Sequence, residues 1–91
     1  MMALGGIVLK EIYLTSKSLT LAQKMKSVLR SGGIFANIVR PDIEITQNSC
    51  AYAVSIEEVF LPEAIEMLSL KGIMPVGIFV VHGNRYEEIR L

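Results

Sequence analysis

The sequence predicts an α+β domain whose elements follow the order β-α-β-β-α-β. Two stretches have the spacing of apolar residues that is typical of a helix, and four stretches rich in β-branched and apolar residues are typical of strands. The length of 91 residues is that of one domain. Two right-handed β-α-β units that share one sheet give four antiparallel strands with both helices on one face, the ferredoxin-like plait.

The first half of the chain is predicted to form a strand, a helix and a second strand. Ile7–Thr15 is the first strand, and Leu19–Ser31 is a helix that places its apolar residues on one face. The helix should end at Gly32–Gly33, because glycine adopts the left-handed conformation of a helix C-terminus without steric cost. Ile34–Val39 is the second strand, and Pro41 ends it because proline has no N–H to donate to a β-ladder.

The second half supplies two more strands and a second helix. A polar loop, Asp42–Ser49, leads to the third strand, Cys50–Ile56, in which side chains alternate between two faces. The second helix begins at Leu61, where proline and glutamate follow in the first turn. Ile73–His82 is the fourth strand, and residues 83–91 are predicted to be a short charged tail.

The apolar content of the chain predicts self-association. Hydrophobic residues make up 52% of the sequence, above the roughly 45–50% that is typical of soluble domains. A domain of this size buries only about 60–65% of the surface of its unfolded chain. The plait also leaves one sheet face without a helix, and the fourth strand is apolar on both sides. We therefore expect the open sheet face to be buried in a homodimer.

Charge and hydropathy exclude several classes of partner. The nine basic and nine acidic residues balance, and a nucleic-acid-binding protein normally shows a basic stripe, so no nucleic-acid partner is predicted. The longest apolar stretch, Ile73–Val81, is too short for a membrane span, which needs about 20 residues. With no secretory signal and a single cysteine, the chain is expected to be cytoplasmic, with a reduced thiol.

Cys50 is the leading candidate for a chemical role, because it lies where the polar loop meets the third strand. The thiolate is the nucleophilic form of cysteine; the pKa of a free cysteine is about 8.5, and nearby cations lower it. Arg40 at the end of the second strand and Lys17 at the start of the first helix can approach it in a plait. The alternative is a packed cysteine, since free cysteines are among the most buried residues in proteins.

A second group of candidates is polar and could bind a ligand: Ser16, Lys17, Ser18, Arg40 and Ser49. Three of them precede the first helix, where free N–H groups and the helix dipole attract anions. Ordinary capping of the helix by the serine hydroxyls is the simpler interpretation. The single histidine, His82, has no second histidine or carboxylate cluster to support it, so neither a metal site nor a cofactor is predicted.

Four short segments between Tyr13 and Ala51 carry a pattern that belongs to a stretch of roughly Ile12 to Ile78. They are Tyr13-Leu14-Thr15-Ser16, Ser18 with Ala22, Leu29-Arg30-Ser31-Gly32-Gly33-Ile34, and Asn48-Ser49-Cys50-Ala51. The pattern resembles a family of small cysteine-containing proteins described as selenium/sulfur carrier-like, although Ala51 stands where that family has glycine. The resemblance implies the plait, and it implies that Cys50 is the cysteine that carries sulfur or selenium.

Three interpretations of function follow. In the first, Cys50 accepts sulfur or selenium from a donor protein and passes it to an acceptor protein. In the second, the domain is a non-catalytic dimeric module that binds a small ligand or a protein. In the third, Cys50 is a redox sensor that forms a disulfide between subunits. No base, metal or cofactor motif accompanies the thiol, so independent enzymatic turnover is not expected.

Overall fold

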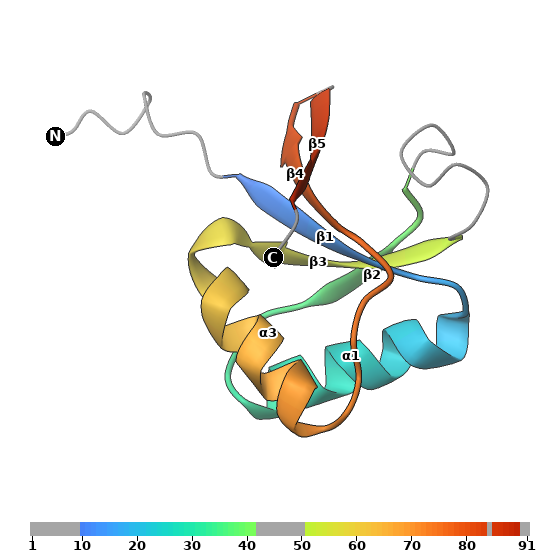
Figure 1. The fold of residues 1–91 in the computed structure, drawn as a ribbon, viewed down its shortest axis with the longest axis vertical. Coiled ribbons are helices and arrows are strands. Elements are labelled where there is room, and N and C mark those ends of the chain that lie inside the picture. Colours follow the sequence, from blue (N-terminus) through green and yellow to red (C-terminus); the bar gives the residue numbers. More distant parts are fainter. Residues whose placement is uncertain (1–9, 42–50, 84, 90–91) are drawn as a thin grey trace, which may run out of the picture.

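The computed structural model describes residues 10–41, 51–83 and 85–89. In this part of the chain a five-stranded antiparallel sheet packs against two α-helices, which makes the domain α+β (Figure 1). The strands lie in the order β2-β3-β1-β4-β5. The elements are β1 (Glu11–Ser16), α1 (Leu19–Ser31), β2 (Asn37–Val39), β3 (Tyr52–Glu57), the 3-10 helix η2 (Glu58–Phe60), α3 (Leu61–Leu70), β4 (Ile78–His82) and β5 (Arg85–Ile89).

The sheet has five strands rather than the four predicted. Arg85–Ile89, which lies in the predicted charged tail, forms β5 and pairs with β4, so that Glu87 is opposite Val80. Gly83, just after β4, has a φ of 58°, a conformation that glycine adopts without a steric penalty. The prediction missed β5 because its charged residues do not alternate with apolar ones. Such residues are common in edge strands, where they oppose pairing with another chain.

Helix α1 begins and ends where the sequence predicts. The N-cap is Ser18, whose Oγ accepts a hydrogen bond from the backbone N–H of Leu21 at 3.1 Å. Beyond the C-terminus, Gly33 has a φ of 91°, so the left-handed residue is the second of the two glycines. The buried residues of α1 are Ala22, Met25 and Leu29, which belong to the predicted apolar face.

The core lies between the two helices and one face of the sheet. Ile12 and Leu14 of β1 lie opposite Ile56 and Val54 of β3, and all four are almost fully buried. Helices α1 and α3 lie side by side across this face (Figure 1). Full burial of an aliphatic side chain stabilises a fold by about 1.5–3 kcal/mol relative to exposure, so this layer holds the domain together.

Two of the observed strands are shorter than predicted. Strand β2 begins at Asn37 rather than Ile34, and Ile34 is instead a buried residue of the connection from α1. Strand β4 begins at Ile78 rather than Ile73, and Ile73 donates its backbone N–H to Leu68 at the end of α3. Neither α1 nor α3, the helices of the described part of the chain, is long and apolar enough to cross a membrane.

Candidate functional site

The predicted site residues that the structure describes lie at the end of the sheet where β3 begins; they are Ser16, Lys17, Ser18 and Arg40. Ser16, the last residue of β1, lies opposite Tyr52, the first residue of β3. On the other side of β3, Val39 at the end of β2 lies opposite Ala53. The ends of β1 and β2 therefore flank the first residues of β3 (Figure 1). In the sequence, Cys50 precedes Tyr52 by two positions.

Cys50 and Ser49 lie outside the described residues, so the roles predicted for them stay predictions. The first described residue after them is Ala51, which is exposed. The described part of the site consists of the side chains that flank the start of β3.

Arg40 lies against the first residue of β3. Its Nη2 donates a hydrogen bond to Oη of Tyr52 at 3.3 Å, and its guanidinium carbon is 5.3 Å from the centre of the Tyr52 ring. At exposed sites such a cation–π contact contributes about 0.5–1 kcal/mol. The Arg40 side chain is itself exposed. A positive charge is thus held at the entrance to β3, where a bound anion can still reach it.

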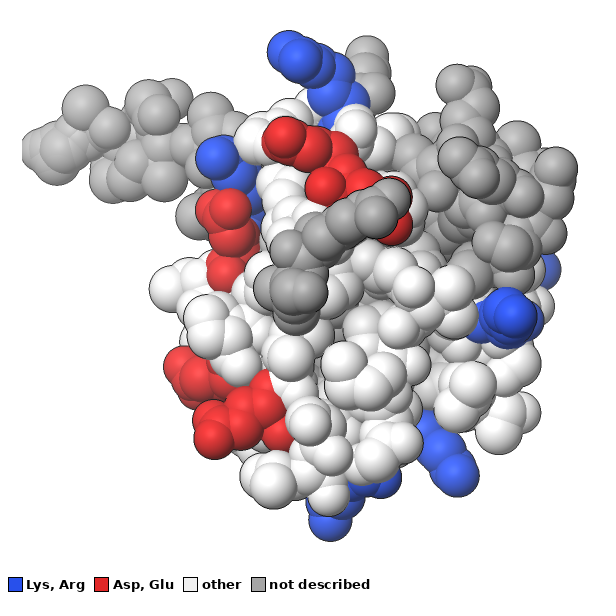
Figure 2. Space-filling view, viewed as in Figure 1, with Lys and Arg blue, Asp and Glu red and all other residues white. Residues whose placement is uncertain are grey.

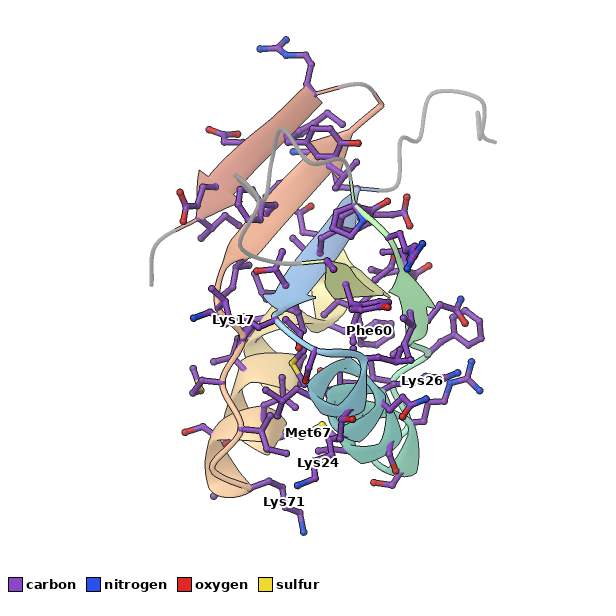
Figure 3. The ribbon with its side chains drawn as sticks, turned by 90° about the vertical axis from the view of Figure 1, so that its right-hand side faces the viewer. Lys17, Lys24, Lys26, Phe60, Met67 and Lys71 are labelled. Atoms are coloured by element: carbon purple, nitrogen blue, oxygen red, sulfur yellow. The ribbon has the colours of Figure 1, made fainter. Side chains whose placement is uncertain are left out.

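The hydroxyl groups of the Ser16–Ser18 turn are engaged within the turn. Oγ of Ser16 donates to the carbonyl of Ser18 at 2.9 Å and accepts the Ser18 N–H at 3.3 Å, and Ser16 is 2% exposed. Ser18 caps α1. Lys17 between them is exposed, and Figure 3 shows it well apart from Lys24 and Lys71 at the far side of the helix layer. The ammonium group of Lys17 is therefore open to a ligand, whereas the hydroxyl of Ser18 caps α1 and that of Ser16 bonds within the turn.

Charged residues separate between the two helices. Helix α1 carries Lys24, Lys26 and Arg30 and no acidic residue, whereas α3 carries Glu63 and Glu66 and no basic residue. Figure 2 shows the corresponding division, with acidic side chains on one side of the lower surface and basic ones on the other. The helix layer therefore has a basic half and an acidic half.

The sheet face opposite the helices carries three aromatic residues, Tyr13, Phe79 and Tyr86, which we call the aromatic patch. The register places Phe79 opposite Tyr13, and the rings of Tyr13 and Tyr86 lie 6.3 Å apart, centre to centre. All three are partly exposed, and no described helix covers them (Figure 1). Glu88 lies opposite Phe79 on the β5 side, so an acidic residue borders the patch.

At the other end of β3 the surface is hollowed by a cavity of about 370 Å³. Among its lining residues are Lys10, Glu11, Phe35, Asn37, Ser55 and Glu57. The sequence analysis selected none of these for a site. The sequence offers one signal, a large apolar residue, Phe35, two positions after Gly33; in the structure Phe35 is 67% exposed.

His82, the remaining candidate, lies at the end of β4 opposite Arg85. It lines a shallow hollow together with Arg85, Tyr86 and Glu87. Across residues 10–41, 51–83 and 85–89, no group of three or more His, Cys, Asp or Glu side chains is arranged to hold a metal ion.

No protein-family model matches the chain, and no curated protein or solved structure is similar enough to count as a match. The resemblance to the selenium/sulfur carrier-like family therefore stays a prediction.

Proposed function

We propose that the chain is a sulfur or selenium carrier in which Cys50 holds the transferred atom as a persulfide-type adduct. One observation supports this role: Arg40 and the Ser16–Ser18 turn lie on either side of the start of β3, which follows Cys50 by two positions in the sequence. Arg40 and Lys17 bring two positive charges to this end of the sheet. Positive charge near a cysteine favours the thiolate, the form that attacks sulfur.

The proposed transfer needs no oxidant. The Cys50 thiolate attacks the outer sulfur of a donor persulfide; a new S–S bond forms to Cys50, the S–S bond of the donor breaks, and the donor leaves as a thiolate. On delivery, the thiolate of an acceptor attacks the outer sulfur and releases the Cys50 thiolate. A reducing, cytoplasmic setting suits this cycle because it keeps Cys50 free between transfers.

We also infer that the domain is a ferredoxin-like plait with one added strand. The order β2-β3-β1-β4 and the antiparallel pairing of each neighbour are those of two interleaved β-α-β units. Strand β5 extends this sheet at the edge of β4. In such a plait Cys50 follows the loop that joins β2 to β3. We therefore expect its thiol at the rim of the sheet.

The reactivity of the thiol tests the role of Arg40. We expect Cys50 in the folded protein to react with iodoacetamide at pH 7 faster than in the urea-unfolded chain, because each unit of lowered pKa raises the thiolate fraction up to about tenfold. Arg40→Gln should slow the folded reaction several-fold. Arg85→Gln, at the opposite end of the sheet, is the matched control and should leave the reaction rate of Cys50 unchanged. Equal rates in folded and unfolded protein would rule out an activated carrier thiol.

The aromatic patch favours a second candidate function, a dimeric binding module that pairs through the open sheet face. Tyr13, Phe79 and Tyr86 present apolar area on a face that no described helix covers. Aromatic side chains are enriched at protein interfaces. Each such face carries Glu11 and Glu88, so pairing two of them brings negative charges near one another. Salt should therefore strengthen the dimer by screening that repulsion.

Sedimentation of the protein over a range of concentrations tests this pairing. We expect Phe79→Lys to convert a dimer into a monomer, because it puts a charge at the centre of the aromatic patch. Leu70→Lys is the control, since Leu70 is 81% exposed on the helix side of the domain. A dimer that survives Phe79→Lys but dissociates in Leu70→Lys would place the interface on the helices instead.

A further inference from the structure

The sheet formed by the described residues has two edges, β2 and β5, and the two edges differ in charge. An edge strand presents unpaired backbone N–H and C=O groups, with which a strand of another chain can pair. β5 carries Arg85, Glu87 and Glu88, and charged side chains on an edge strand oppose such pairing. β2, Asn37–Val39, has no charged residue. A charge that protects the β2 edge therefore has to come from another element.

Arg30, in the last turn of α1, brings a charge to the outer side of β2. Its Nε donates a hydrogen bond to the carbonyl of Ala36 at 2.9 Å, just before β2 begins. Because β3 occupies the inner side of this segment, a carbonyl that bonds to Arg30 points to the outer side. Backbone groups along an antiparallel strand point alternately toward the neighbouring strand and away from it. The groups of Ile38, two positions after Ala36, therefore point outward as well, on the side where the guanidinium lies.

The Arg30 side chain also reaches the sheet face opposite its own helix. Ala36 and Ile38 belong to the core beneath the helices, so Phe35 and Asn37, which alternate with them, face the other way. The guanidinium carbon of Arg30 lies 5.0 Å from the centre of the Phe35 ring, and Nη2 donates to Oδ1 of Asn37 at 3.2 Å. Arg30 therefore begins on the helix side of the sheet, passes the outer edge of β2 and ends on the open face.

We propose that Arg30 is a strap that closes the β2 edge to a second copy of this chain. Without the strap, two β2 strands can pair antiparallel about a two-fold axis at Ile38, with Asn37 of one copy opposite Val39 of the other. A second copy fits this edge because two identical, uncharged strands of three residues pair over their whole length. Pro41 keeps the pairing short, since proline has no N–H to donate. The charged β5 edge takes no part, so the product is a closed dimer and not a filament.

Sedimentation in reducing buffer tests the strap, in a Phe79→Lys background that removes pairing through the open sheet face. The background protein should stay monomeric. Adding Arg30→Ala should give a dimer whose fraction rises with concentration. Lys24→Ala is the matched control, because Lys24 is an exposed cation of the same helix, and this variant should stay monomeric. Circular dichroism checks that each variant keeps its helices.

Hydrogen exchange locates the new contact. At a concentration at which about nine-tenths of the Arg30→Ala chains are paired, the amide of Ile38 should exchange about tenfold more slowly than in a dilute sample, because only the unpaired tenth exchanges. Adding Asn37→Lys should return the variant to a monomer, because it gives β2 a charge of the kind that β5 carries. Association caused by a damaged core would not be reversed in this way.

A monomeric Arg30→Ala protein would overturn the proposal. The same conclusion would follow from a dimer in which Ile38 exchanges at its monomer rate, or from association that persists when Asn37→Lys is added. None of these outcomes bears on the pairing of the open sheet faces, because Phe79→Lys alone tests that pairing.

Discussion

Replacing Cys50 by alanine is expected to abolish sulfur uptake completely. After incubation with a persulfide donor and removal of excess reagent, the intact mass of the parent protein should rise by the mass of one sulfur atom. The Cys50→Ala variant should show no increase, since the chain contains one cysteine and no other residue can form a persulfide. The added sulfur should leave the parent when an acceptor thiol is supplied, because the outer sulfur of a persulfide is open to attack by a second thiolate.

The neighbouring hydroxyl supplies the matched control for this experiment. Ser49→Ala removes a predicted ligand-binding side chain while leaving the thiol, so it should still take up one sulfur atom, at a rate that reports any help from the hydroxyl. A parent protein that gains no sulfur from the donor would contradict the carrier role. If it gains none, and Cys50→Ala still forms the dimer that Phe79→Lys disrupts, the binding module becomes the better account.

The same samples separate the carrier from the redox sensor. A sensor would form a covalent dimer through Cys50 on oxidation, visible on a non-reducing gel and absent from Cys50→Ala. A carrier keeps one thiol or one persulfide per chain and stays a single covalent species. The two roles therefore differ in the mass of the oxidised product.

Much of the fold could be predicted because it depends on local patterns. The bounds of α1 follow from an apolar stripe between a serine cap and two glycines, and the structure has the same bounds, Leu19–Ser31. The alternation in β3 puts Val54 and Ile56 in the core, as an amphipathic strand should. Both helices and four of the five strands that the described residues form were therefore accessible from spacing alone.

The predicted strand bounds are wrong where apolar residues are buried in a connection and do not belong to a strand. Ile34 and Ile73 have the composition of strand residues, but they lie in connections between a helix and a strand, Ile34 buried and Ile73 partly so. Strand β5 shows the reverse: it is charged, and only its pairing with β4 makes it a strand. Propensity cannot predict that pairing, because tertiary context decides it.

The candidate sites show the same limit. Arg40 lies beside Tyr52 at the start of β3, as expected of two neighbouring antiparallel strands that follow each other in the chain. The pairing of Glu11 with Glu57 was not expected, because their positions are 46 residues apart and only the β1–β3 register makes them neighbours. A register shift of one residue would send one of the two carboxylates to the other face.

Replacing Leu14 by alanine is expected to have the largest effect on stability. Leu14 lies on the central strand β1, between Val54 of β3 and Ile78 of β4, and is fully buried. Truncating a buried leucine to alanine typically lowers the free energy of unfolding by about 2–5 kcal/mol. The whole free energy of unfolding of a small domain is only about 5–15 kcal/mol. Urea unfolding followed by circular dichroism should therefore show a much lower midpoint with a similar slope.

Leu70→Ala is the matched control, because it makes the same chemical change at a leucine that is 81% exposed at the end of α3. It should change the free energy of unfolding by no more than about 0.5 kcal/mol. Equal effects of the two substitutions would contradict the assigned register of β1. Leu14 and Tyr13 would then exchange faces, because side chains alternate along a strand, and the pairing of Glu11 with Glu57 would be lost with the same shift. The Leu14 measurement therefore tests the core and the register of β1 together.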